Sequence, residues 1–335
     1  MKEQRYNDFV GKIVPLRRIS AKQMTSRQQK GHLATFVTNL LFGVNIPIAR
    51  TILPMVIIPT AMTQLRFVGA AVAFWILSFF LPKEHVPLKD LGKLFFASLF
   101  AILLNQSLFI VGLARTSSTD ASIMITFTPV LTMVLAAFFL KEPVTWKKVS
   151  GVFLGMAGAL LLIFNGADAN MESNGKMYGN ILCLLSGLSY AVYLTAFKSI
   201  IVKYNAITLM KWMFLFSAIL FLPFSSSDML YFDWSNITRI EWLKISFVVF
   251  VATFLTYLLI PIAQKSIRPT TMTMYNNMQP LIAAGIAIML GMDQFSMVKV
   301  VAALLIFFGV YVVTKSKSRE QLEKERQEIE NSNLM

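Results

Sequence analysis

Long runs of hydrophobic residues, each close to the length that crosses a bilayer, recur along the whole chain. A helix needs about 20 consecutive apolar residues to span the hydrocarbon core, where a continuous helix satisfies its own backbone groups. The pattern therefore predicts an all-α integral membrane protein with ten transmembrane helices. Their expected ranges are 32–51, 60–81, 91–112, 118–140, 147–165, 178–201, 206–224, 240–262, 269–291 and 297–314.

Lys and Arg residues concentrate in the tails and in alternate connections between these segments. If both chain ends face the cytoplasm, the inner segments hold 23 Lys or Arg, and the outer loops hold only Arg115, Lys176 and Arg239. Cytoplasmic loops of membrane proteins carry such an excess. The charges predict an N-in/C-in orientation, with a basic tail over 1–31 that touches anionic lipid. Whether translation starts at Met1 or Met24 is left open.

The chain contains an internal repeat. The stretch "MITFTPVLTMVLAAFFLKEP" (124–143) lies over "YNNMQPLIAAGIAIMLGMDQ" (275–294) at an offset of 151, which matches Pro129 with Pro280. The first spans of the two halves match at an offset of 148, and the second spans match at 145.

Each half holds five spans, so the second half enters the membrane from the opposite side. Inverted repeats of this kind are typical of secondary transporters, with the substrate site between the halves. The predicted organisation is two inverted five-helix repeats at 32–165 and 178–314, a linker over 166–177, and a charged tail over 315–335.

Proline inside a transmembrane helix is tolerated where side chains or neighbouring helices satisfy the carbonyl that it frees. Polar groups lie beside both prolines; they are Thr126, Thr128, Asn276, Asn277 and Gln279. Pro129 and Pro280 are therefore predicted hinges for alternating access, with a static packing kink as the alternative.

Two further features are interpreted as structural. The carboxylates of Glu142 and Asp293 precede helices, where the helix dipole favours them. Gly151, Gly155 and Gly158 are expected to allow close helix packing.

Polar residues at membrane depth are the candidates for a substrate site. They are Asn45, Asn105, Gln106, Tyr190, Tyr193, Tyr257, Tyr275, Asn276 and Gln279. Neutral amides and phenols suit a zwitterionic or amphipathic solute, although hydrogen bonding between helices is the alternative role for each one. The middle of every span lacks acidic residues, which argues against a standard proton-coupled antiporter.

Arg66 and Lys211 lie about one turn inside their spans and match each other in the repeat. Snorkelling of both side chains to the membrane interface is the favoured interpretation. The alternative is a pair of gate charges that steer an anionic substrate.

The segments "GLARTSSTDASIMITFTPV" and "KEPVTWKKVSGVFLGMAGALLLIF", followed by a diverged second copy, resemble the EamA type of the drug/metabolite transporter superfamily. The resemblance covers about residues 32–315. It implies a carrier in the inner membrane for small organic solutes, often an exporter of amino acids or metabolites. The second copy departs from the pattern, with Ala302 and Ile306 in place of glycines.

Two other functions stay open. One is a carrier of phosphorylated sugars or nucleotide-sugars, which would favour two or more basic residues deep in the cavity. The other is a non-transporting sensor or scaffold.

The composition agrees with a membrane class and narrows the chemistry. Hydrophobic residues make up 56% of the chain and charged residues 14%, against about 25% charged in soluble domains. The lone Cys183 excludes a disulfide framework, and His32 and His85 are too few and too separated for a metal centre. No nucleophile–base pair or carboxylate pair occurs at depth, so an enzyme is not expected.

The expected partners are a small-molecule substrate and the lipid bilayer, with no nucleic acid, metal or cofactor. A homodimer is left open.

Overall fold

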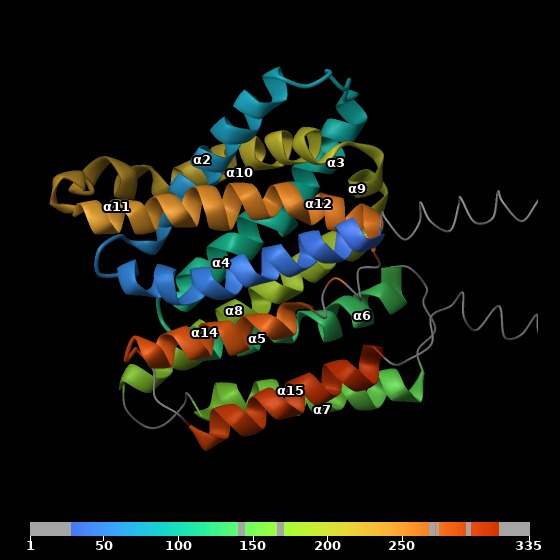
Figure 1. Ribbon diagram of the computed structural model, residues 1–335, viewed down its shortest axis with the longest axis vertical. Coiled ribbons are helices and arrows are strands. Elements are labelled where there is room, and N and C mark those ends of the chain that lie inside the picture. The colour runs from blue at the N-terminus through green and yellow to red at the C-terminus, as the bar shows by residue number, and fades with distance from the viewer. Residues whose placement is uncertain are drawn as a thin grey trace, which may run out of the picture.

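The computed structural model describes residues 28–139, 145–165, 171–267, 272, 275–292 and 296–314, and in these ranges it is helical without strands (Figure 1). A first helix covers Gln28–Ile52. The elements that follow are α2 (Pro59–Phe79), α3 (Leu88–Ser98), η1 (Leu99–Leu104), α4 (Asn105–Leu113), α5 (Ser118–Thr126), α6 (Thr128–Phe139), α7 (Trp146–Asn165), α8 (Met171–Ala196), α9 (Lys198–Lys203), α10 (Ala206–Tyr231), η2 (Trp234–Asn236), α11 (Arg239–Ser246), η3 (Phe247–Leu255), α12 (Thr256–Ser266), η4 (Tyr275–Asn277), α14 (Met278–Met289) and α15 (Met297–Thr314). Glu142, Asp293, residues 1–27 of the N-terminal tail and the whole C-terminal tail lie outside the described residues.

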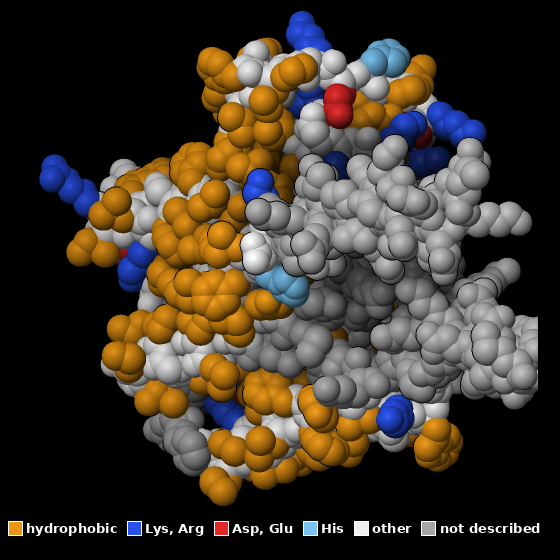
Figure 2. All heavy atoms as spheres, turned by 45° about the vertical axis from the view of Figure 1, so that its right-hand side comes forward, with side chains coloured by type: hydrophobic (Ala, Val, Ile, Leu, Met, Phe, Trp, Pro, Cys, Tyr) orange, Lys and Arg blue, Asp and Glu red, His pale blue; other side chains and the backbone are white. Residues whose placement is uncertain are grey.

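The prediction of an all-α, multi-span membrane protein is confirmed. Within the described residues, seven helices are long and apolar enough to cross a membrane. Three shorter apolar helices, Val149–Gly158, Met278–Met289 and Met297–Gly309, lie in the fifth, ninth and tenth predicted spans. Large apolar side chains such as Phe138 and Phe153 are exposed, and Figure 2 shows hydrophobic side chains over much of the described surface in view, as lipid contact requires.

Helices from the two halves of the chain pack against each other in pairs. α2 packs on α10, α4 on α8, α5 on α14 and α7 on α15, the last pair lying side by side at one end of the molecule (Figure 1). A Cβ added to Gly309 would stand 2.6 Å from the carbonyl oxygen of Gly151, and one added to Gly158 would stand 2.7 Å from that of Ala302. Small residues therefore bring α7 and α15 close together, as glycines do in membranes.

The fourth span is interrupted where the sequence places its proline. α5 ends at Thr126 and α6 begins at Thr128, one residue before Pro129. Because proline lacks an N–H, the carbonyl of Ile125 loses its helical partner. The Thr128 hydroxyl donates a hydrogen bond to that carbonyl at 2.6 Å. In the ninth span, the short 3₁₀ helix η4 likewise precedes Pro280 in α14. A hinge motion at either proline stays a prediction.

The third and eighth spans share a second irregularity. In each, a π-helical segment joins two α-helices: η1 lies between α3 and α4, and η3 lies between α11 and α12. The two segments end at Leu104 and Leu255, which are equivalent at the repeat offset of 151. Such wide turns are rare and frequently occur at functional sites. Here each of them leads directly into residues at the centre of the molecule.

Candidate functional site

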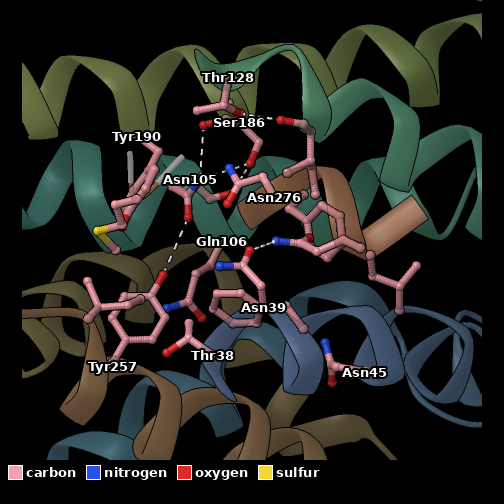
Figure 3. A pocket seen from close by; sticks show the side chains of 18 of the residues that line it. Thr38, Asn39, Asn45, Asn105, Gln106, Thr128, Ser186, Tyr190, Tyr257 and Asn276 are labelled. Atoms are coloured by element: carbon pink, nitrogen blue, oxygen red, sulfur yellow. Dashed lines mark hydrogen bonds between the residues drawn. The ribbon is translucent and has the colours of Figure 1, made fainter. Parts of the chain in front are cut away.

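A cavity of about 90 Å³ lies where the two halves meet. Its volume is well above the roughly 10–15 Å³ that one water needs, so it can hold a small solute. The lining residues come from both halves (Figure 3); they are Thr38, Asn39, Phe42, Asn45, Ile46, Arg66, Asn105, Gln106, Phe109, Ile125, Thr128, Ser186, Gly187, Tyr190, Tyr257, Ile260, Met272, Asn276 and Gln279.

The structure brings most of the predicted site residues together. Seven of the nine line the cavity: Asn45, Asn105, Gln106, Tyr190, Tyr257, Asn276 and Gln279. Tyr193 and Tyr275 are not among the lining residues. The Tyr193 hydroxyl lies 3.5 Å from Oε1 of Gln264, and the Tyr275 hydroxyl lies 2.9 Å from Nδ1 of His32.

Several polar lining residues were absent from the predicted site, namely Thr38, Asn39, Thr128 and Ser186. The repeat carries a signal for two of them. Thr38 matches Ser186 at the offset of 148, so comparison of the two halves places a hydroxyl at the same depth in each.

Some of the polar groups hold helices together. The Asn105 amide donates to the carbonyl of Ser186 at 2.9 Å and to its hydroxyl at 3.0 Å. The Tyr257 hydroxyl donates to Oδ1 of Asn105 at 3.4 Å. Asn105 thus joins α4, α8 and α12 at the cavity wall (Figure 3). Its hydrogen-bonding capacity is largely used within the protein.

Other polar groups in the lining are buried without a protein partner. The amide nitrogen and oxygen of Gln106, Oδ1 of Asn45 and the hydroxyl of Thr38 all lack one. Buried polar atoms are normally hydrogen-bonded, and each exception calls for an explanation. A polar ligand bound in the cavity would supply the missing partners.

Among the described residues of the lining, Arg66 is the one that carries a charge. It is 3% exposed, and its Nε donates to the hydroxyl of Thr253 at 2.8 Å. One terminal nitrogen, Nη1, has no partner. The snorkelling interpretation is therefore wrong for Arg66: α2 packs on η3 and α10, which encloses the guanidinium instead of leading it to the membrane surface.

Lys211, its repeat counterpart, does not reach the cavity. The Lys211 ammonium lies 4.9 Å from the ring centre of Trp75 and 5.9 Å from that of Trp212. Cation–π attraction accounts for this position. The two halves of the chain thus contribute unequal charge to the cavity. The Arg66 guanidinium belongs to the cavity lining, whereas the Lys211 ammonium lies near tryptophan rings.

The lining holds no Asp, Glu or His among the described residues. Groups of three or more His, Cys, Asp or Glu that could hold a metal are likewise absent from the described part of the chain. The described ion pairs of Asp90 and Asp120 involve residues outside the lining. The cavity can therefore attract an anionic group and offer neutral hydrogen bonds.

Comparison with known proteins agrees with this arrangement. The EamA-like transporter family matches residues 29–164 and again residues 177–315. The uncharacterized transporter YetK of Bacillus subtilis is 28% identical over 196 residues, covering 58% of this chain and 58% of that protein. An uncharacterized transporter of Archaeoglobus fulgidus is 30% identical over 166 residues, covering 50% of this chain and 57% of that protein. The matched stretch thus spans less than two thirds of either relative.

Two further similarities cover more of the chain. A WAT1-related protein of Arabidopsis thaliana is 26% identical over 285 residues, covering 74% of this chain and 76% of that protein. A solved crystal structure with 17% sequence identity and a TM-score of 0.60 covers 86% of this chain and 98% of its own, which shows a shared fold. Since the family matches most of the sequence in two successive copies, the chain belongs to the EamA-like transporter family and is a multi-pass membrane protein.

Proposed function

We propose that the protein is a secondary transporter that carries amino acids or related small carboxylate-bearing metabolites through this cavity. Alternating access between the two inverted halves moves the solute across the membrane. The observation that carries the proposal is the buried guanidinium of Arg66 in a cavity without a described carboxylate.

A buried charge is costly unless it is paired. The Arg66 guanidinium has one neutral partner, Thr253, and a terminal Nη1 without a partner. A carboxylate accepts hydrogen bonds from guanidinium nitrogens in a strong, charge-assisted geometry. An anionic group on the solute therefore completes this site.

The rest of the lining supports a solute that also carries neutral or cationic polar groups. Oδ1 of Asn45 and Oε1 of Gln106 are free acceptors for an ammonium. Phe42 and Phe109 add apolar wall. A single guanidinium suits one carboxylate better than a multiply charged phosphate, which disfavours phosphorylated sugars and nucleotide-sugars.

The proposed setting is a bacterial-type inner membrane with both chain ends in the cytoplasm, as the Lys and Arg distribution indicates. The proposed direction is export. Because the described lining holds no acid or histidine, the solute's own gradient is the proposed driving force, and flux is expected to be insensitive to an imposed pH gradient.

The test is counterflow of labelled L-leucine, L-methionine and L-phenylalanine into liposomes that contain the purified protein. For the best substrate, unlabelled competitors with and without the carboxylate are compared; for leucine they are leucine and leucinol. We expect leucine to compete at least about tenfold better, since a charge-assisted hydrogen bond contributes about 1.5–3 kcal/mol.

Arg66→Gln is expected to abolish this preference, and Arg66→Lys to keep part of it. Lys198→Gln is the control, since Lys198 is an exposed residue of α9. Variants are compared only after gel filtration verifies that each is folded. Equal competition by leucine and leucinol in the wild-type protein would contradict the proposal.

A further inference from the structure

Thr253 does not line the cavity, but it contacts a residue that does, Arg66. Its hydroxyl accepts a hydrogen bond from Nε of Arg66 at 2.8 Å. The same hydroxyl donates to the carbonyl of Val248, five residues earlier, at 2.7 Å. Thr253 is fully buried and is not itself part of the lining.

The π-helical geometry of η3 explains this double contact. In an α-helix a threonine hydroxyl bonds the carbonyl three or four residues back. The wider turn of η3 presents the carbonyl five residues back instead. Donation to Val248 fixes the hydroxyl proton, so an oxygen lone pair faces Arg66.

The other half of the chain has the same wide turn without this chemistry. At the offset of 151, Thr253 matches Ile102 in η1. The side chain of Ile102 has no polar atom, and the repeat counterpart of Arg66, Lys211, lies near the rings of Trp75 and Trp212. Both repeats therefore contain a π-helical segment. The segment of the second repeat carries a threonine that contacts a basic residue, and the segment of the first repeat does not.

We infer that Thr253 is a positioning residue that holds the Arg66 guanidinium in the orientation that meets the solute. With Nε engaged by Thr253, the unpartnered Nη1 is left for a solute in the cavity that Arg66 lines. The effect on transport rests on the proposed function, whereas the positioning of Arg66 does not.

The first test measures the contact directly. In ¹⁵N-arginine-labelled protein in detergent micelles, the Arg66 Nε–H signal is assigned by its loss in Arg66→Lys. Thr253→Val removes the acceptor at nearly constant shape, and hydrogen exchange of this group is expected to accelerate about tenfold or more. Thr253→Ser should restore slow exchange.

The matched control is Thr195→Val. The Thr195 hydroxyl is buried and bonds carbonyls of its own helix, those of Ala191 and Val192. Its loss should leave Arg66 exchange unchanged. Unchanged exchange in Thr253→Val would overturn the inference.

The second test separates positioning from a general structural effect. For the best-transported labelled amino acid of the panel, Thr253→Val should raise KM about tenfold with little change in maximal rate, because it loosens a contact that is made equally in the ground state and the transition state. Thr253→Ser should return KM toward the wild-type value. Faster exchange with an unchanged KM would overturn the role in solute binding.

Failure of the proposed function is distinguishable from failure of this inference. If the wild-type protein carries none of the three amino acids, the proposed substrate class fails. The exchange measurement alone then decides whether Thr253 positions Arg66.

Discussion

Nε2 of Gln279 donates a hydrogen bond to Oδ1 of Asn39 at 2.7 Å, which ties α14 to the first helix at the cavity wall. The repeat matches Asn39 with Gly187 and Gln279 with Thr128. These two counterparts also meet, since a Cβ added to Gly187 would stand 2.7 Å from the Thr128 hydroxyl oxygen. One pair of helices is therefore joined by the two amides of Asn39 and Gln279. At the repeat-related contact, the glycine Gly187 packs against the hydroxyl of Thr128.

Removing the amide of Asn39 is expected to destabilise the protein. Asn39→Ala leaves the buried Gln279 amide without its acceptor, and such contacts between membrane helices contribute about 0.6–2 kcal/mol. The measurement is thermal unfolding in detergent. Thr38→Val on the same helix is the control, because the Thr38 hydroxyl has no partner to lose. Equal melting temperatures for the two variants would contradict the assignment of the pair.

The close packing of α7 against α15 predicts that two glycine-to-alanine substitutions will have opposite effects on stability. In Gly309→Ala the new Cβ would meet backbone atoms of Gly151 and Gly155 at 2.6–2.7 Å, so the helices must separate and the melting temperature should fall. Gly285→Ala is the matched control, since a Cβ there meets nothing within 4 Å. Replacing a helical glycine by alanine then adds about 0.5–1 kcal/mol of stability. A fall of similar size in both variants would argue against close packing of these helices.

The spans, the repeat and seven of the polar residues that line the cavity could be predicted from the sequence. Long apolar runs and matched prolines are strong signals that survive divergence between the two halves. The enclosure of Arg66 could not be predicted, because depth along a span does not reveal which helix covers a side chain. Its partner Thr253 lies 187 positions away. The π-helical segments could not be predicted either, because the sequence "LFAILL" over Leu99–Leu104 is typical of an ordinary α-helix.

The two tyrosines that lie outside the lining illustrate a related limit. Tyr193 is one turn from Tyr190 on the same helix, and the two rings lie 5.9 Å apart. Only Tyr190 lines the cavity. Residue type and depth are alike for both, so only the packing of α8 separates them.

A charged cluster at the start of the third span is expected to contribute the same stability at every pH from 6 to 9. Asp90 pairs with Lys203, and the Tyr204 hydroxyl donates to the same carboxylate at 2.6 Å. The hydrogen bond to Asp90 raises the pKa of Lys203 above its usual value. A raised lysine pKa contributes stability that is fully present below the unfolded-state pKa, near 10.4, and is lost only as pH rises through the folded pKa.

The melting-temperature difference between wild type and Lys203→Met should therefore stay constant from pH 6 to pH 9. Thermal unfolding in detergent across that range measures it. A difference that shrinks steadily as pH rises from 6 to 9 would show that Lys203 loses its proton at a lower pH than the Asp90 contact allows.

The buried carboxylate of Asp120 is expected to be the most sensitive ionic position in the described part of the chain. Asp120 is 1% exposed. Its two oxygens lie 3.3 Å from Nζ of Lys176 and 3.7 Å from Nζ of Lys299, which joins α5 to α8 and α15. Removing one partner of a buried ion pair costs about 3–5 kcal/mol. The partial exposure of Lys176 places Asp120→Asn toward the lower end of that range.

A double-mutant cycle distinguishes a true ion pair from a merely disruptive substitution at Asp120. If Asp120 and Lys299 interact, Asp120→Asn combined with Lys299→Met should cost less than the sum of the single variants, by about 0.5–3 kcal/mol of unfolding free energy. Asp233→Asn is the control, because that carboxylate is exposed and its hydrogen bonds within the described residues are with its neighbours Ser235 and Asn236. Strict additivity in the cycle would mean that Asp120 and Lys299 do not interact, and that this ion pair does not link α5 to α15.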